Sequence, residues 1–341
     1  MNEESQTEDE TAKLDFKSVH IDKEWKHDAP LIGCRFDPSG RFVFSTSMDQ
    51  NLQRWNLEDG QKVALSGHES WLRAIGFSKD GNRAFTAGYD GRLCFWDNES
   101  QSTEPLKTID AHHGWVRWLS VSPDGNLIAT AGNDLVVRIW NSNSGDLVHE
   151  LKGHQKHIYS LFFHPTGDFL ASGDLEGKIH IWETNQFGKA RTLEAKALHT
   201  YHTGQQVDYG GVRCMDLSKD GTELACGGLH KGTNPFAGVQ EPLVVVLHWQ
   251  TGDEIRTHEA TQITHGILWR LHYLQDGTLM GASGGGTGGF LVFWGKEEKT
   301  DVHKFKLPNT VLDMDYAPDS LTVAAAHHDG RLTLSRLTEK A

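Results

Sequence analysis

The feature that most constrains this chain is a unit of short strands and turns that recurs along it. Its clearest copy is residues 67–97, GHESWLRAIGFSKDGNRAFTAGYDGRLCFWD, and it returns at residues 111–141 and 153–183. Within each copy, alternating apolar runs are separated by turns rich in Gly and Asp, which is typical of antiparallel hairpins. A period of about 40 residues predicts a repeat array instead of two unrelated domains.

The number of units follows from one turn that lies between two alternating apolar runs. This turn occurs seven times, beginning at Asp37, Ser78, Ser122, His164, Ser218, Leu274 and Ala317. The first six units also end in a tryptophan, namely Trp55, Trp96, Trp140, Trp182, Trp249 and Trp294. Unit seven has Ser335 at that place. The sequence therefore contains seven units.

The strand count predicts how the array closes. Six units supply three strands and then a fourth, at residues 61–65, 105–109, 147–151, 191–194, 254–258 and 302–307. Unit seven ends near Lys340 without a fourth strand, whereas residues 16–22 alternate like a strand and have no partner nearby. We therefore predict an all-β fold, a seven-bladed β-propeller of four-stranded antiparallel blades whose last blade is closed by this N-terminal strand.

The composition limits the domain organisation, the kinds of partner and the cellular compartment that we expect. Residues 1–13 are acidic and lack apolar side chains to offset ordering, so we expect a disordered tail followed by one domain over residues 14–341. A net charge of -13 argues against binding to nucleic acid or to an anionic membrane. The N-terminus has no apolar signal segment, and reduced cysteines inside predicted strands favour a cytoplasmic protein. These cysteines are Cys34, Cys94, Cys214 and Cys226.

Four polar positions recur at fixed spacing in the first four units. A His lies eighteen residues before a Ser or Thr, an acid follows four residues later, and a Trp follows six after that. The four sets are His27, Ser45, Asp49, Trp55; His68, Thr86, Asp90, Trp96; His112, Thr130, Asp134, Trp140; and His154, Ser172, Glu176, Trp182. This pattern resembles the WD40 repeat, over about residues 14–337, and the resemblance implies that each set is a hydrogen-bonded tetrad. Such a chain would satisfy a buried indole N–H and a buried imidazole.

A Ser, a His and an acid also suggest a catalytic triad. Four copies in one chain favour a structural role, so we expect no catalytic residue, no enzyme activity and no cofactor. In unit five the acid and the imidazole exchange places as Asp208 and His230. We predict that these two side chains still pair.

The resemblance to WD40 proteins implies a non-enzymatic scaffold that binds a partner protein or peptide on the top face of the propeller. The candidate residues enter the first strands or lie beside the tetrad acids, and aromatic and Arg side chains dominate interface energies. They are Trp71, Arg73, Tyr89, Trp115, Arg117, Asn133, His157, Tyr159 and His328. The alternative is that the tryptophans merely cover the blades while each arginine is solvated. We expect a monomer or a subunit of a complex.

Unit five carries two insertions, residues 196–210 and 230–241, which we expect on that same face. They are either a binding element or tolerated surface length. We expect no metal site, although His199, His202, Asp208 and His230 could converge there on a zinc ion. Two rival interpretations therefore stay open: a propeller enzyme or metal-binding protein with its site in these loops, and a structural subunit of a larger assembly.

Overall fold

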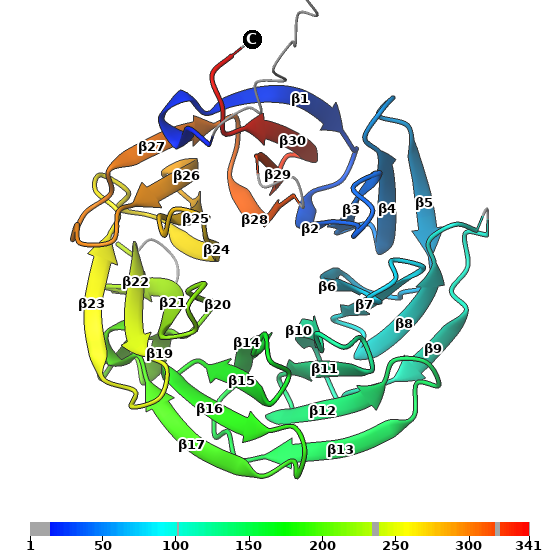
Figure 1. The fold of residues 1–341 in the computed structure, drawn as a ribbon, viewed down its shortest axis with the longest axis horizontal. Helices are drawn as coiled ribbons and strands as arrows, with labels where there is room; N and C mark the ends of the chain where they lie inside the picture. Colours follow the sequence, from blue (N-terminus) through cyan, green and yellow to red (C-terminus); the bar gives the residue numbers. More distant parts are fainter. Residues whose placement is uncertain (1–13, 101, 234–238, 318–320, 341) are drawn as a thin grey trace, which may run out of the picture.

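The computed structural model of the chain describes residues 14–100, 102–233, 239–317 and 321–340. Figure 1 shows seven four-stranded sheets arranged as blades around a central axis, which confirms the predicted seven-bladed propeller. The predicted tail, residues 1–13, lies outside the described residues. Among those that are described, no helix is long and apolar enough to cross a membrane.

Each blade is an antiparallel meander with its first strand nearest the axis and its fourth at the rim. Blade one contains β2 (Leu31–Phe36), β3 (Phe42–Ser47), β4 (Asn51–Asn56) and β5 (Lys62–Ser66). Blade two contains β6 (Leu72–Phe77), β7 (Arg83–Gly88), β8 (Arg92–Asp97) and β9 (Lys107–Asp110). Blade three contains β10 (Val116–Val121), β11 (Leu127–Gly132), β12 (Val136–Asn141) and β13 (Leu147–Lys152). Blade four contains β14 (Ile158–Phe163), β15 (Phe169–Asp174), β16 (Lys178–Glu183) and β17 (Lys189–Glu194).

The later blades keep this order, and the second and third strands of blades five and six are longer than those of blades one to four. Blade five contains β20 (Cys214–Leu217), β21 (Glu223–His230), β22 (Glu241–His248) and β23 (Glu254–Glu259). It is preceded by a short 3-10 helix, η2 (Lys196–Leu198), and a separate hairpin of β18 (His199–His202) and β19 (Val207–Gly210). Blade six contains β24 (Ile267–Tyr273), β25 (Leu279–Gly285), β26 (Gly288–Trp294) and β27 (His303–Leu307). Blade seven contains β28 (Val311–Tyr316), β29 (Thr322–His327), β30 (Arg331–Arg336) and β1 (His20–Lys26).

The closure of the ring by the N-terminal segment is confirmed. Strand β1 pairs antiparallel with β30, from His20 opposite Arg336 to Lys26 opposite Arg331. The predicted bounds of this strand, residues 16–22, are wrong at both ends. Residues Phe16–Ser18 form the 3-10 helix η1, because the Asp15 carboxylate accepts hydrogen bonds from the Lys17 amide at 3.0 Å and the Ser18 hydroxyl at 2.6 Å.

Side chains occupy the axis that looks open in the ribbon of Figure 1. The guanidinium of Arg270, in blade six, lies 4.2 Å from the ring centre of Trp118, in blade three. Its Nε donates to Asp313 Oδ1 at 2.9 Å, and Arg35 donates to the other oxygen of Asp313 at 2.7 Å. All of these groups except Arg35 are buried. The buried carboxylate is therefore compensated by two arginines, and the contact across the axis joins opposite blades.

Candidate functional site

The candidate site begins with a β-bulge in the innermost strands. In six blades the register between the first two strands shifts across one residue near the start of the first strand, and this residue is left unpaired. A β-bulge changes the direction of the side chain of the residue that it leaves unpaired. The bulged residues are Ile32, Arg73, Arg117, Tyr159, Trp269 and Leu312. In blade five the corresponding residue is Arg213, which precedes β20 and donates its amide to Gly227 at 2.8 Å.

The turns between the second and third strands fold back over the starts of the first strands. In five blades the amide of one turn residue donates to the residue that enters the first strand, at 2.8 to 3.0 Å. In blade three this bond runs from Asn133 to the carbonyl of Trp115, and a Cβ on Gly132 would lie 1.8 Å from that carbonyl oxygen. The close approach explains the glycine. The five turn residues are Met48, Tyr89, Asn133, Leu175 and His328.

These two features assemble a continuous row of rings and guanidinium groups, which we call the top-face ladder. Trp71 lies 6.1 Å from Tyr89, and Tyr89 stacks on Trp115 with ring centres 4.4 Å apart and an interplanar angle of 5°. The Arg117 guanidinium lies 5.2 Å from the Trp115 ring and 4.7 Å from the Tyr159 ring. The ladder ends at Arg213, which lies 3.7 Å from the Tyr159 ring. It therefore spans blades two to five.

A second contact reaches across the axis. The Arg73 guanidinium, from blade two, lies 5.7 Å from the ring of Trp269, in blade six. Arg73 also donates to the carbonyl of Ile32 at 2.6 Å. Arg73 and Trp269 are therefore neighbours at the top of the axis although their blades are not.

The predicted top-face residues are brought together in part. Six of the nine predicted residues make ladder contacts or contacts across the axis, and Asn133 supports them because its Oδ1 accepts from Arg117 Nε at 2.6 Å. His157 and His328 are on the same face through their backbones but make no ring or cation contact with the ladder among the described residues. Arg213 and Trp269 were missed. The run Val212-Arg213-Cys214 repeats Val116-Arg117-Trp118, so the sequence did carry a signal for Arg213.

The polar tetrads of blades two and three form as expected. In blade two, Trp96 Nε1 donates to Thr86 Oγ1 at 2.8 Å, His68 Nε2 lies 2.9 Å from the same oxygen, and His68 Nδ1 lies 2.9 Å from Asp90. Blade three repeats this arrangement with Trp140, Thr130, His112 and Asp134. The side chains of both histidines are fully buried, so no substrate could reach them. These tetrads stabilise the blades instead of forming catalytic triads.

The predicted acid of the blade-four tetrad is wrong. His154 Nδ1 pairs with Asp174 at 2.7 Å, while Glu176 pairs with Lys178 at 2.8 Å. Asp174 follows Ser172 by two residues and is buried, so its short side chain meets the imidazole directly. The other bonds of this tetrad, from Ser172 to His154 and Trp182, are as predicted.

The blade-one tetrad is divided into two pairs. Trp55 Nε1 donates to Ser45 Oγ at 2.8 Å, and His27 Nε2 pairs with Asp49 at 2.7 Å. No hydrogen bond joins His27 to Ser45 in the described structure. Lys62 Nζ lies 3.0 Å from His27 Nδ1, so the other ring nitrogen faces the acid. The expectation of a complete tetrad in this blade is therefore wrong.

The predicted pairing of Asp208 with His230 is also wrong. The carboxylate of Asp208 bonds to Lys156 at 2.7 Å and to His199 at 2.9 Å, because the hairpin of β18 and β19 places His199 beside it. The hairpin and the other insertion do lie together, since a Cβ on Gly232 would meet Tyr209 at 2.9 Å.

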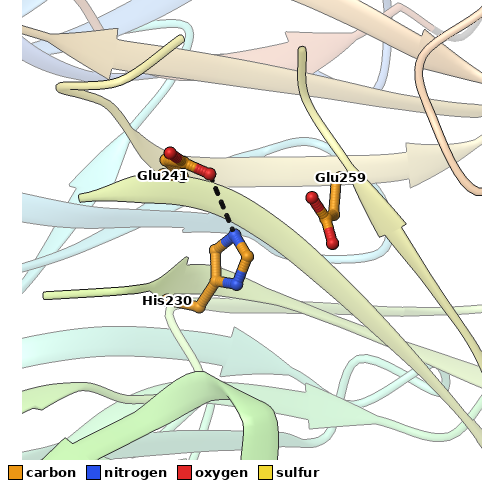
Figure 2. A group of neighbouring side chains, drawn as sticks. All are labelled: His230, Glu241 and Glu259. Carbon is orange, nitrogen blue, oxygen red and sulfur yellow. Dashed lines mark ion pairs between the residues drawn. The ribbon is translucent and has the colours of Figure 1, made fainter. Parts of the chain in front are cut away.

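The metal candidates of blade five are separated in the same way. His202 Nδ1 accepts from the Gln205 amide at 3.1 Å, and His230 turns toward Glu241 and Glu259 at the ends of three neighbouring strands (Figure 2). Ligand atoms of this second group lie within 4.8 Å of one another. However, Lys231 Nζ lies 2.7 Å from Glu241 and 3.9 Å from Glu259. Because a lysine ammonium already lies beside both carboxylates, we assign no metal site to them.

Comparison with known proteins places this architecture among repeat proteins. The family model of the WD domain, G-beta repeat, matches residues 22–56, 60–97, 103–141 and 145–183. The chain is 31% identical over 212 residues to a guanine nucleotide-binding protein subunit beta-like protein of Encephalitozoon cuniculi, covering 55% of this chain and 62% of that protein.

Two further relatives are longer proteins. Nuclear distribution protein PAC1 of Arthroderma otae is 26% identical over 193 residues, or 48% of this chain and 42% of that protein. Transcription initiation factor TFIID subunit 5 of Caenorhabditis elegans is 26% identical over 157 residues, or 46% of this chain and 24% of that protein. The matches thus span less than two thirds of each relative.

Proposed function

The chain belongs to the WD40-repeat family, and from that premise we propose that it is a non-enzymatic scaffold that holds a partner protein or peptide against the top face of its propeller. The observation that carries this proposal is the top-face ladder. Trp71 and Trp115 are each 44% exposed, yet both are held in place by aromatic contacts. Rigid, exposed aromatic groups beside arginines are the side chains that contribute most to interface energies.

Two further features support this surface. The ladder residues are fixed by bulges and backbone bonds of the rigid sheets, so little conformational entropy would be lost on binding. The relatives also include proteins named as subunits, of a guanine nucleotide-binding protein type and of transcription factor TFIID. By analogy we propose that this chain works within a complex. Its four free, buried cysteines favour the cytoplasm as the compartment.

The test is capture of partners by the double variant Trp115→Ala/Arg117→Ala. Tagged wild type and variant would be incubated with extract of the native cell, and bound proteins quantified by mass spectrometry. We expect the principal partner to fall by roughly tenfold or more, as for hot-spot residues. The melting temperature should stay within a few degrees of wild type, because both changes are at the surface.

A matched control changes the same kinds of side chain elsewhere. Leu106, 59% exposed next to the outer strand β9, and Arg83, the first residue of β7, would both be replaced by alanine. Partner capture should be unchanged. If the control abolishes capture while the ladder variant retains it, the chain binds through its rim, and the top-face proposal is wrong.

A further inference from the structure

Three arginines gather at the top of the axis without an acidic partner. Within the part of the chain that the structure describes, Arg73, Arg117 and Arg213 form no ion pair with an Asp or Glu side chain, although other buried or half-buried arginines do. Each instead donates one N–H to a neutral acceptor: the carbonyl of Ile32, the side-chain amide of Asn133 and the carbonyl of Gly210. Each guanidinium also lies over an aromatic ring, of Trp269, Trp115 or Tyr159.

The acids next to Tyr89, Asn133 and Tyr209 in the chain are engaged elsewhere. Asp90 pairs with His68, Asp134 pairs with Arg138, and Asp208 pairs with Lys156. The arginines also act on one another, since burial and then the charges of Arg117 and Arg73 lower the pKa of Arg213. Like charges held together in a half-buried site are unfavourable unless an anion neutralises them. The three arginines therefore form a local positive site at the top of the axis, which we call the mouth. The chain as a whole carries a net charge of -13, so the mouth is opposite in sign to the rest of the protein.

The donor geometry favours carboxylates. The Nε–H groups of Arg117 and Arg213 each donate to a neutral acceptor, at 2.6 and 3.0 Å. Both terminal nitrogens of each guanidinium therefore remain for a ligand. A guanidinium presents five N–H donors in a planar fork that matches the two oxygens of a carboxylate. Separate arginines around one mouth therefore suit several separate carboxylates.

We propose that the segment held at this mouth is an acidic peptide. Its Asp or Glu carboxylates bond to Arg73, Arg117 and Arg213, and a neighbouring apolar side chain packs on Trp71 or Trp115. This inference rests on the proposed function and adds the chemistry of the partner. A basic segment would be repelled by the three charges, and single-stranded nucleic acid would need a basic track longer than one ring of arginines.

The experiment measures fluorescence anisotropy with four labelled probes. They are a decapeptide of alternating Asp and Glu around one central Leu, its Asn and Gln analogue, a Ser-rich decapeptide with one phosphoserine, and a ten-nucleotide oligo-dT. We expect the acidic peptide to bind at least tenfold more tightly than each of the others. Its affinity should fall between 50 and 200 mM NaCl, because salt screens the contacts.

Variants then locate the binding. Arg117→Gln/Arg213→Gln should weaken the acidic peptide by tenfold or more, and Arg117→Gln alone should weaken it measurably if the double variant does not fold. The control, Lys79→Gln/Arg83→Gln, removes the same charge from the turn after β6 and the first residue of β7, at the other end of β6 from Arg73. It should leave the affinity unchanged.

Several outcomes would overturn the inference. They are equal binding of the acidic peptide and its neutral analogue, tighter binding of the phosphopeptide or the oligonucleotide, undiminished binding by the arginine variants, and equal weakening by the control. These outcomes are separable from failure of the proposed function. If the ladder variant still loses its native partner while the acidic probe shows no preference, only the acidic chemistry is wrong.

Discussion

Replacing Thr86 with valine should destabilise the protein, whereas the same replacement at Thr46 should not. Both side chains are fully buried in second strands of neighbouring blades, and valine has nearly the shape of threonine. The difference lies in their hydroxyl groups. Thr86 Oγ1 lies 2.8 Å from Trp96 Nε1 and 2.9 Å from His68 Nε2, whereas Thr46 Oγ1 has no hydrogen-bond partner in the described structure.

The expected magnitudes follow from what each change leaves behind. Thr86→Val leaves the indole N–H of Trp96 and one nitrogen of His68 without partners, and each buried unsatisfied group costs about 1–3 kcal/mol. Removing the hydroxyl itself recovers roughly 1–2 kcal/mol of desolvation. Taking the middle of each range, the free energy of unfolding should therefore fall by about 2–3 kcal/mol. Thr46→Val only removes a buried group without a partner, so the free energy should stay the same or rise by about 1 kcal/mol.

The assay is urea denaturation of wild type and both variants, followed by circular dichroism and tryptophan fluorescence at one pH. The two probes should report the same midpoint for each protein. The reasoning would be refuted if the two variants lost similar stability, because loss of shape alone would then explain both. It would also fail if Thr86→Val lost less than about 1 kcal/mol.

The remaining predictions concern the other tetrads and the ring closure. Asp174→Asn should lower the free energy of unfolding by about 2–3 kcal/mol, because the buried His154 loses the carboxylate that its Nδ1 contacts, whereas Glu176→Gln should change this free energy by less than about 0.5 kcal/mol; equal effects in urea denaturation would contradict the assignment. Against the opposing effect of burial, the hydrogen bond with Asp90 raises the pKa of His68 to about 9, whereas burial and Arg138 lower the pKa of His112. The contribution of His68 to stability should be complete below about pH 6.5 and lost as pH rises through about 9. The contribution of His112 to stability should be present above about pH 6.5 and lost as pH falls through its lowered pKa. An NMR titration that showed both imidazole rings protonated at pH 7.5 would be inconsistent with these assignments. Removing residues 1–26 should lower the free energy of unfolding by at least about 3 kcal/mol relative to removing residues 1–13, because Trp25 and the whole of β1 are lost; differential scanning calorimetry giving the same melting temperature would contradict this.

The fold could be predicted because its signals are local and repeated. Each turn, each alternating run and each tetrad spacing lies within one unit. An imperfect unit can therefore be assigned by comparison with the other copies. The N-terminal strand was found by counting the strands of each unit. Its bounds were missed because two local hydrogen bonds to the Asp15 carboxylate make residues 16–18 helical, and the repeat pattern does not contain them.

The site was predicted only where it follows the repeat. Trp71, Tyr89 and Trp115 keep their places in the unit, and the structure stacks Tyr89 on Trp115 with Trp71 tilted beside Tyr89. The contact of Arg73 with Trp269 joins blades two and six. It depends on how the blades close around the axis, which the spacing of residues within one unit does not reveal. Asp174 was missed for another reason. It occupies a position that is glycine in the neighbouring units, so the constant spacing of the repeat selected Glu176 instead.

The pairing of β1 with β30 has a consequence for how the chain is made. His20 leaves the ribosome early, but its partner Arg336 follows about 300 residues later, which at roughly 5–20 residues per second is about 15–60 s. During that interval β1 is an unpaired edge while blades one to six can already assemble. Strand β1 is thus the segment that newly synthesised chains can exchange with one another, and the molecule is most vulnerable to mispairing just before its last blade is complete.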